Sequence, residues 1–411
     1  MSRPKINLRR ILVLGGTISL LVVYPILYAR MLSSPRDRTG ADFISLYTAG
    51  RAARLYGLEE VYNLDLQRTI QQDIVGFELA PDQVLLYNHM PYIIPLLGWM
   101  TSANYVSSFV RWSLFSIILY AIAIFLLQDV AGAKTAMHKR RSLYFIGAIT
   151  FYPLFVSIVN GQDTPILFLG AALWVWGFSK EKDAVAGLGL ALATIRPHIA
   201  LMLSLPFLFK RRKVWWWFLA SATVLGLFSI LLIGPGGVKS FMTMLLLTAG
   251  GDWFGMHQSQ MVNVLGLTIR LFPTLPEKSL QAAAWGFYLL AILGLCILWI
   301  KSRQVDLRHL ATEVLVAILF VPHLHYHDLT LLLIPVTILI LCRDDLPLLK
   351  DLPELPLIVS MLLLFSSSVA VVKLSIPYLV IAVLLVLLWL PKRFLNKAGS
   401  LPDEESSPTG T

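Results

Sequence analysis

The sequence predicts an all-α polytopic membrane protein, and three observations support this class. Of the 411 residues, 57% are apolar and only 14% are charged, and the mean hydropathy is +0.71, far from the composition of a soluble domain. Apolar runs of roughly 18 or more residues recur along the chain, and each is long enough to cross about 30 Å of hydrocarbon. The runs are continuous and lack the alternation that a β-barrel needs, so we expect the spanning elements to be helices.

Charge and cysteine content exclude several other classes. The net charge of +10 does not indicate nucleic-acid binding, because the basic residues form short clusters between apolar runs, where they determine topology. The two cysteines, Cys296 and Cys342, lie inside or at the end of apolar runs and make neither a disulfide framework nor a zinc site. The first apolar run is too long for a signal peptide and lacks a clear cleavage site, so we expect a retained span.

The N-terminal part predicts a span followed by a folded outer loop. Arg9 and Arg10 place the N-terminus in the cytoplasm, and residues 11–30 cross outward. Residues 31–82 form a polar first outer loop that is long enough to fold. Residues 83–100 are apolar but are broken by prolines and an internal Asn-His pair, so we expect an interfacial segment that dips against the bundle.

The middle of the chain contains a segment whose halves are too short to cross separately. Residues 184–209 lie between the basic clusters KEK and KRRK, which predict that both ends are cytoplasmic. Each half has about 10–13 residues, or about 15–20 Å of helix. We therefore expect a short hairpin with Arg196, Pro197 and His198 at its tip.

The complete layout is a bundle of about twelve transmembrane helices, with the hairpin counted as two and both termini inside. Residues 1–395 form a single transmembrane domain, and residues 396–411 form a disordered cytoplasmic tail. After the span 214–233, an outer segment of about forty residues ends near Pro276. The crossings outside the hairpin are residues 11–30, 107–128, 143–159, 164–179, 214–233, 279–300, 309–321, 328–342, 355–372 and 377–391.

This layout gathers the chemically versatile residues on the outer side. Ionisable groups at or below a membrane surface are costly, and they are therefore functional candidates. The cytoplasmic loops instead carry plain Lys/Arg and Glu clusters. The NGQD turn, residues 160–163, has a common loop composition and is a weak signal alone. It matters because it connects two adjacent spans on the outer side. The outer set is Asp42, His89, Asn160-Gly161-Gln162-Asp163, Arg196, His198, His257, Gln258 and the His323–Asp328 cluster.

Asp42 begins the stretch DFISLYTAGRAARLY, which has the period of an amphipathic helix. In one interpretation Asp42 is an N-cap whose carboxylate accepts the free amide protons of the first turn. In the other it is a catalytic base, for which one carboxylate suffices if its pocket raises the pKa. The two roles exclude each other only in part.

Arg196 at the hairpin tip also has two interpretations. Its side chain can extend to the outer headgroups of the lipid. Alternatively, because the helices are too short to lift the tip into bulk water, the guanidinium needs an anion, and its paired donors suit phosphate. Backbone amides beyond Pro197 would add donors at a helix N-terminus.

The stretch VPHLHYHDLTLLLIP, residues 321–335, places three histidines at alternate positions before Asp328. On a helix His323 and His327 share a face, whereas in an extended segment all three histidines do. The extended form could hold zinc, but no cysteine and no HExxH glutamate supports it, so we predict no metal site. Two roles stay open, as hydrogen-bonding caps of interfacial helices and as groups that bind a phosphate or polar hydroxyls.

Five stretches in this order resemble glycosyltransferase family 87, whose members are bacterial polyprenol-phosphate-mannose-dependent mannosyltransferase-like membrane proteins with the GT-C fold. The similarity runs through most of the chain, and the ordered set is more specific than any one motif. The stretches are ADFISLYTAGRAARLYGLEEVYN, YNHMPYIIPLLGWM, NGQDTPILFLGAALWVWG, GLGLALATIRPHIALMLSLPFLFKRRK and HLHYHDLTLLLIP.

The resemblance implies a GT-C-like bundle that transfers a hexose, expected to be mannose, from a polyprenyl-phosphate donor to a lipid or glycan acceptor. The family's base maps onto Asp42, and its basic residue before the hairpin proline maps onto Arg196 at the donor phosphate. His198, His325 and His327 join that phosphate site in our prediction. The residues expected to contact substrate are Tyr47, His89, Asn160, Gln162, His257 and Asp328. The implied location is the bacterial cytoplasmic membrane, with the site facing the periplasm or cell exterior.

Two departures from the family pattern concern three positions: many relatives carry lysine where Arg196 stands, and His325 and His327 differ from many relatives at variable positions. Some GT-C enzymes hold a divalent ion with two acids of the first loop. Here Asp42 stands alone, with Asp37 five residues away, so we predict a metal-independent, inverting displacement that needs no cofactor. A transporter or flippase of lipid-linked saccharide is the main alternative, but the cytoplasmic half of the spans shows few polar residues for a through-path. A metal-ion permease is a weaker one, because intramembrane carboxylates are almost absent from the apolar runs.

Overall fold

The computed structural model describes residues 8–34, 41–130, 141–249, 253–255, 257–342, 354–368 and 376–389. Within these ranges the regular structure is entirely helical, which confirms the predicted all-α class. Four helices of the described chain are long and apolar enough to cross a membrane, and shorter apolar helices of 10–17 residues accompany them. The total of about twelve crossings therefore stays a prediction. The predicted tail, residues 396–411, lies outside the described residues.

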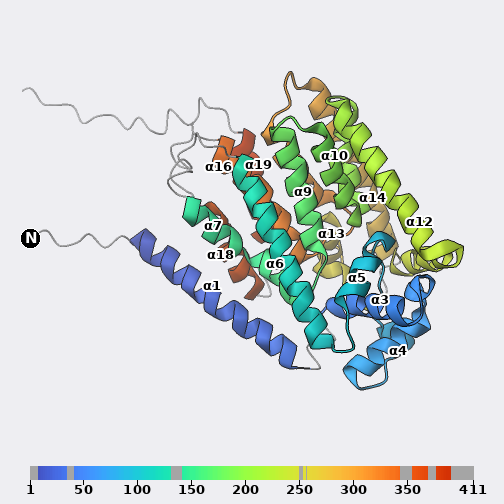
Figure 1. Cartoon of the computed structure of the whole chain (residues 1–411). Coiled ribbons are helices and arrows are strands. Elements are labelled where there is room, and N and C mark those ends of the chain that lie inside the picture. Colours follow the sequence, from blue (N-terminus) through green and yellow to red (C-terminus); the bar gives the residue numbers. More distant parts are fainter. Residues whose placement is uncertain are drawn as a thin grey trace, which may run out of the picture.

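Helices α6, α9, α10 and α12 pack side by side in this order and form the central row of the bundle (Figure 1). Helices α3, α4 and α5 lie together at one end of this row, and α1 runs diagonally at its side. The bounds are α1 (Leu8–Ser33), α3 (Phe43–Leu55), α4 (Leu64–Val75), α5 (Ile94–Met100), α6 (Tyr105–Val130), α9 (Thr164–Ser179), α10 (Asp183–Leu192) and α12 (Arg212–Ala249).

The remaining helices complete the bundle, and short 3₁₀ turns connect several of them. The helices are α7 (Arg141–Ile149), α8 (Tyr152–Asn160), α11 (Pro197–Ser204), α13 (Val264–Leu271), α14 (Glu277–Lys301), α15 (Leu307–Phe320), α16 (Leu333–Cys342), α18 (Leu355–Ser368) and α19 (Ile376–Trp389). The 3₁₀ turns are η1 (Leu58–Tyr62), η2 (Pro81–Gln83), η3 (Pro91–Ile93), η5 (Ala193–Ile195), η6 (Leu205–Leu208), η7 (Gln258–Gln260) and η8 (Tyr326–Leu332).

Glycines of α10 explain why the central row is so tightly packed. A Cβ atom on Gly189 would lie 2.5 Å from the carbonyl oxygen of Gly170 in α9. A Cβ atom on Gly187 would lie 2.4 Å from the Cβ atom of Trp217 in α12. Small residues allow helix backbones in a membrane bundle to approach each other closely. The GLGLA stretch therefore fits α10 between its two neighbours.

The segment around residues 184–209 turns back on itself. At its ends the guanidinium of Arg211 contacts the carboxylate of Asp183, with 2.6 Å between Nη2 and Oδ1. Arg196 lies at the turn, between η5 and α11. The two ends of this segment therefore lie together at one end of the bundle, and Arg196 lies at the far end of the hairpin.

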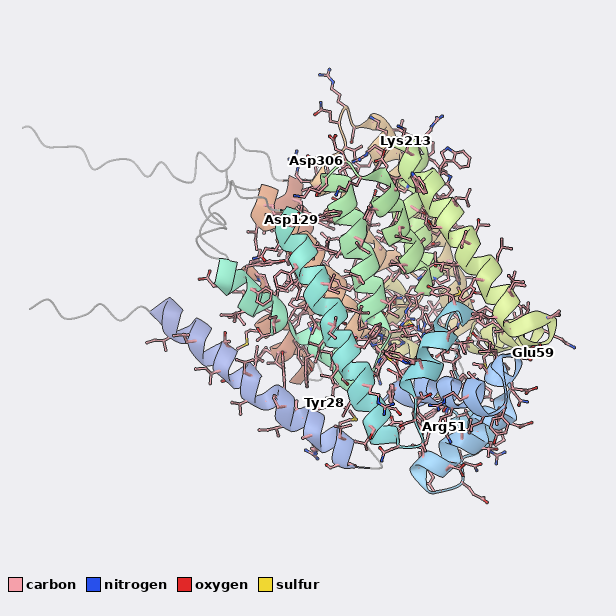
Figure 2. All side chains as sticks on the ribbon, viewed as in Figure 1. Tyr28, Arg51, Glu59, Asp129, Lys213 and Asp306 are labelled. Atoms are coloured by element: carbon pink, nitrogen blue, oxygen red, sulfur yellow. The ribbon has the colours of Figure 1, made fainter. Side chains whose placement is uncertain are left out.

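The two ends of the bundle carry different parts of the predicted layout. Asp129, Lys213 and Asp306, which belong to predicted cytoplasmic loops, lie at one end (Figure 2). Tyr28, near the outer end of the predicted span 11–30, and Arg51 and Glu59 of the predicted first outer loop lie at the other end. The end with α3, α4 and α5 is called the α3 end below.

Two predicted spans differ from the structure because of local backbone chemistry. Helix α12 does not stop at residue 233 but continues to Ala249 across a break at Gly234, whose φ is 61°. Pro235 restarts the helix, since its fixed φ suits a first helical turn. The predicted span 143–159 is two helices, α7 and α8, because Pro153 lacks the amide that a continuous helix needs and instead lies in the first turn of α8.

Candidate active site

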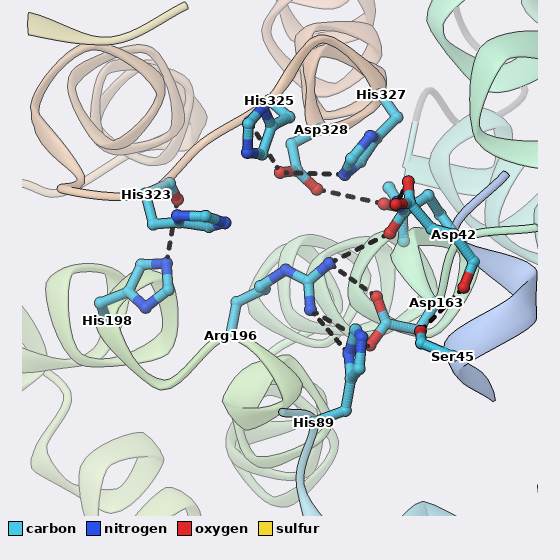
Figure 3. Close-up of polar contacts among 12 residues, drawn as sticks. Asp42, Ser45, His89, Asp163, Arg196, His198, His323, His325, His327 and Asp328 are labelled. Carbon is cyan, nitrogen blue, oxygen red and sulfur yellow. Dashed lines mark hydrogen bonds and ion pairs between the residues drawn. The ribbon is translucent and has the colours of Figure 1, made fainter. Parts of the chain in front are cut away.

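Polar side chains from well-separated parts of the chain meet in one cluster (Figure 3). Each is placed by the start of a helix or by a turn, so the cluster depends on how the helix ends are arranged. Its members are Asp42 at the start of α3, His89 before η3, Gln162 and Asp163 before α9, Arg196 before α11, and His327 and Asp328 in η8.

Arg196 and Asp163 form the buried ion pair of this cluster. Nη2 of Arg196 lies 2.7 Å from Oδ1 of Asp163, and Nη1 lies 3.1 Å from Oδ2. Nδ1 of His89 lies 2.5 Å from the same Oδ2. Burial alone would raise the pKa of Asp163, but Arg196 and His89 outweigh it and hold the pKa well below its usual range. Asp163 is therefore ionised and fixes the guanidinium from one side.

One donor of Arg196 has no acceptor. Its Nε atom is buried and lacks a hydrogen-bond partner among the described residues. A buried donor without a partner costs about 1–3 kcal/mol. An anionic oxygen placed at this atom would remove that cost, which is the property expected of a phosphate-binding arginine.

Gln162 connects Asp42 to Arg196. Its Nε2 donates a hydrogen bond to Oδ2 of Asp42, and its Oε1 lies 3.5 Å from Nη2 of Arg196. The backbone carbonyl of Gln162 accepts a hydrogen bond of 3.2 Å from the indole of Trp112. The carboxylate and the guanidinium are thus held by the same amide side chain.

Gly161 allows this contact by its conformation and by its size. It ends α8 with φ 67°, and a Cβ atom on it would lie 2.4 Å from the Cβ atom of Phe43. The turn therefore approaches the first residue of α3 closely. Because Phe43 directly follows Asp42, this approach brings Gln162 to Asp42.

Replacing Gly161 with alanine should destabilise the protein. The substitution places a methyl group against Phe43 and adds left-handed strain, with expected costs of about 1–3 and 1–2 kcal/mol. We expect a lower thermal unfolding midpoint of the detergent-purified protein, and less transfer activity because Gln162 is displaced. Gly76→Ala is the matched control, since Gly76 has φ 77° and open space around it. An equal loss in both variants would contradict the role given to the close approach.

Asp42 occupies the N-cap position of α3, but its carboxylate makes no capping hydrogen bond. Its backbone oxygen instead accepts a hydrogen bond of 2.8 Å from the hydroxyl of Ser45. Burial raises the pKa of Asp42, while His327, the Gln162 hydrogen bond, His89 and Arg196 oppose this effect only in part. The side chain is thus available for chemistry, with a carboxylate that is more basic than usual.

Asp328 organises the late histidine segment. Its Oδ2 accepts a hydrogen bond of 3.2 Å from the backbone of His325 and lies 3.5 Å from Nε2 of His327. Its Oδ1 accepts a hydrogen bond of 3.1 Å from the hydroxyl of Thr164 in α9. Asp328 therefore closes the turn before η8, orients His327 towards the cluster and joins η8 to α9.

The three histidines follow neither simple pattern considered from the sequence. Residue 325 is extended and precedes the 3₁₀ turn η8. The ring centroids of His323 and His325 are 4.8 Å apart, and those of His325 and His327 are 5.9 Å apart. Burial, followed by the neighbouring His327, lowers the pKa of His325 to about 3, so this ring is neutral.

His198 lies on the His323 side of the cluster. Its Nε2 is 3.1 Å from the backbone oxygen of His323, and its own carbonyl accepts a hydrogen bond of 2.8 Å from Tyr288 in α14. His198 thus joins the hairpin tip to the late histidine segment. In Figure 3, His198 and Asp163 lie on opposite sides of Arg196.

The other residues expected at the site lie at its edge or outside it. Tyr47 is buried, and its hydroxyl donates to the carbonyls of Ser102 and Ala103 at 2.8 and 3.2 Å, so it braces the start of α6. Asn160 is the last residue of α8. His257 is exposed and lies near enough to His325 to oppose its protonation.

Asp163 is the main site residue that the sequence analysis placed in the outer set without giving it a role. Its side chain is fully buried, and it is the ion-pair partner of Arg196. The available signal was an acid in a turn directly before an apolar run, at a depth where an unpaired charge is costly. Thr164, the partner of Asp328, had no comparable signal because threonine is common at helix starts.

Within the described part of the chain, no group of three or more His, Cys, Asp or Glu side chains has an arrangement that could hold a metal ion. His89 and His327 instead contact carboxylates, and His198 contacts a backbone carbonyl. Figure 3 shows that Asp163 contacts Arg196 and His89, while Asp328 contacts His325, His327 and the hydroxyl of Thr164.

The fold and the cluster define a polytopic helical membrane protein with an acid–base and cationic site at one end of its bundle. The model of glycosyltransferase family 87 matches residues 91–324, which is more than half of the chain. The chain therefore belongs to glycosyltransferase family 87 and is a membrane glycosyltransferase. This confirms the family that its motifs resemble. No curated protein matches the chain. The matched range contains Gln162, Asp163 and Arg196, whereas Asp42 and Asp328 lie outside it.

Proposed function

We propose that the protein transfers a hexose, expected to be mannose, from a polyprenyl-phosphate donor to a hydroxyl of a lipid or glycan acceptor. The reaction takes place on the non-cytoplasmic face of a bacterial cytoplasmic membrane. It inverts the anomeric centre in one displacement and uses no metal. The α3 end of the bundle faces outward in this proposal.

The proposed step moves one proton and one sugar. Asp42 accepts the proton of the acceptor hydroxyl as its oxygen attacks the anomeric carbon. The bond between this carbon and the phosphate oxygen breaks, and polyprenyl monophosphate leaves with both electrons and one additional negative charge. Arg196 stabilises that developing charge, and the neutral imidazole of His325 and the ring of His327 complete the polar surroundings.

The observation that supports this proposal is the connection of Asp42 with Arg196 through the single side chain of Gln162. A base for the acceptor and a cation for the leaving phosphate must lie on opposite sides of one anomeric carbon. The unpaired Nε atom of Arg196 supplies the phosphate with a donor that no other described group uses. Asp163 and His89 keep the guanidinium in place without occupying that donor.

The pH dependence of transfer follows from the environment of Asp42. A general base acts only when ionised, and burial raises the pKa of this carboxyl above its ordinary value of 3.8. We expect kcat/KM for the donor to fall as the pH decreases through this raised pKa. The acidic limb of the pH profile therefore lies at higher pH than it would for an ordinary aspartate. The profile is measured with saturating acceptor. A flat profile down to the ordinary aspartate range would contradict the assignment of the base.

The donor class is tested by offering purified protein polyprenyl-phosphate-mannose, a nucleotide-linked mannose and a panel of acceptors. We expect glycosylated acceptor and free polyprenyl phosphate in equal amounts, from the lipid donor alone, and no loss of rate after treatment with a chelator. A transporter would move the donor across a vesicle membrane without releasing polyprenyl phosphate. Transfer from the nucleotide donor alone, or loss of activity with the chelator that metal restores, would contradict the corresponding part of the proposal.

A further inference from the structure

The orientation of the Gln162 amide is determined by its two partners. An ionised carboxylate only accepts hydrogen bonds and a guanidinium only donates them. The amide nitrogen must therefore face Asp42, and the amide oxygen must face Arg196, as the contacts show. Gln162 is 5% exposed, and the indole of Trp112 holds its backbone. A side chain with both ends and its backbone engaged has little freedom to rotate.

We propose that Gln162 is a positioning residue that couples the base to the phosphate-binding cation, rather than a group that contacts the substrate. This inference rests on the proposed function and assigns Gln162 a different role from the substrate contact expected from the sequence. The amide donates to Asp42 and orients its carboxylate, while its oxygen anchors the guanidinium on the side away from Nε. The spacing between the acceptor hydroxyl and the leaving phosphate is then set by one side chain.

A neutral amide suits this role better than a charged group would. A lysine at this position would pair with Asp42 and remove its basicity, whereas a glutamate could not donate to the carboxylate. Three charged or titratable groups also face Asp42: His327 from η8, His89 from the segment before η3, and Arg196. Any test must separate Gln162 from these groups, because each of them also lowers the pKa of Asp42.

The first test needs no substrate and uses a double-mutant cycle on thermal unfolding. Wild type, Gln162→Leu, Asp42→Asn and the double variant are compared in detergent over a range of pH. A hydrogen bond to the ionised carboxylate contributes most when Asp42 is charged, so we expect Gln162→Leu to lower the unfolding midpoint increasingly as the pH rises. In the Asp42→Asn background the effect of Gln162→Leu should not vary with pH. The contributions of His89 and His327 cancel because all four proteins contain them.

The same effect of Gln162→Leu at every pH, in both backgrounds, would overturn the proposal and leave Gln162 with packing alone. The second test uses transfer. Loss of a hydrogen bond to a charged group is expected to lower kcat by about 10- to 100-fold in Gln162→Leu, with a smaller change in KM for the donor. Gln162→Glu retains the shape and should move the acidic limb to higher pH, because the new carboxylate disfavours ionisation of Asp42.

The two tests separate failure of this inference from failure of the proposed function. If wild type transfers no sugar from any lipid donor, the proposed function fails, while the unfolding cycle still decides the coupling. If wild type is active and Gln162→Glu leaves the acidic limb unchanged, the coupling fails and the proposed function stands.

Discussion

Asp42→Asn should lower sugar transfer by about 10²- to 10⁴-fold while leaving the protein folded. The asparagine amide has nearly the same shape and can still accept the hydrogen bond from Gln162, but it cannot take a proton from the acceptor. We expect the loss to appear in kcat, measured with purified protein and labelled lipid donor. Asp65→Asn is the control, since Asp65 is an exposed residue of the first turn of α4 and should have no effect on transfer.

The stability of Asp42→Asn distinguishes a catalytic role from a structural one. Because the pKa of Asp42 is raised in the folded state, ionisation of this carboxyl weakens folding once the pH is above the ordinary aspartate value. Asparagine removes that cost. We therefore expect an unfolding midpoint at neutral pH that is equal to that of wild type or higher. Activity at the wild-type level, or inactivity caused only by unfolding, would remove Asp42 from the mechanism.

Arg196→Ala should have the second large effect, with transfer reduced by about 10²- to 10³-fold per folded molecule. The substitution removes the cation at the leaving phosphate and leaves His89 as the remaining partner of the buried carboxylate of Asp163. Breaking a buried ion pair in this way also costs about 3–5 kcal/mol of stability. Arg196→Lys keeps the charge but cannot make the paired contacts with Asp163, so we expect an intermediate rate.

Arg211 provides the matched control for Arg196. It ends the same hairpin and pairs with Asp183 at 2.6 Å, but it lies at the opposite end of the bundle from the cluster. Arg211→Ala should lower the unfolding midpoint and leave kcat per folded protein unchanged. Equal losses of kcat in Arg196→Ala and Arg211→Ala would indicate that the hairpin arginines act through stability alone.

The class of the fold and the hairpin follow from local properties of the sequence. Apolar length determines helices such as α6 and α14, and short apolar halves between basic clusters indicate a turn near Arg196. Local patterns were less informative where one residue redirects the backbone. The stretch Gly-Pro-Gly-Gly is typical of a helix end, yet Pro235 begins a further helical stretch after the break at Gly234.

The contacts within the site were harder to predict because they join helix ends that are far apart in the chain. The sequence placed Asp42, Gln162 and Arg196 on one side, but not in contact through one amide. It placed Asp163 on the same side but gave it no role, since only the structure shows that its carboxylate meets the guanidinium of Arg196. It assigned Tyr47 to the substrate, whereas the partners of that hydroxyl are backbone carbonyls of a turn more than fifty positions later.

The most direct test of the account is an experimental structure of the protein with polyprenyl monophosphate, the proposed leaving product. We predict a phosphate oxygen within hydrogen-bonding distance of Nε of Arg196, with the phosphate directed towards the space beside Asp42. A phosphate bound elsewhere, with this Nε still unpaired, would contradict the shared site for base and cation.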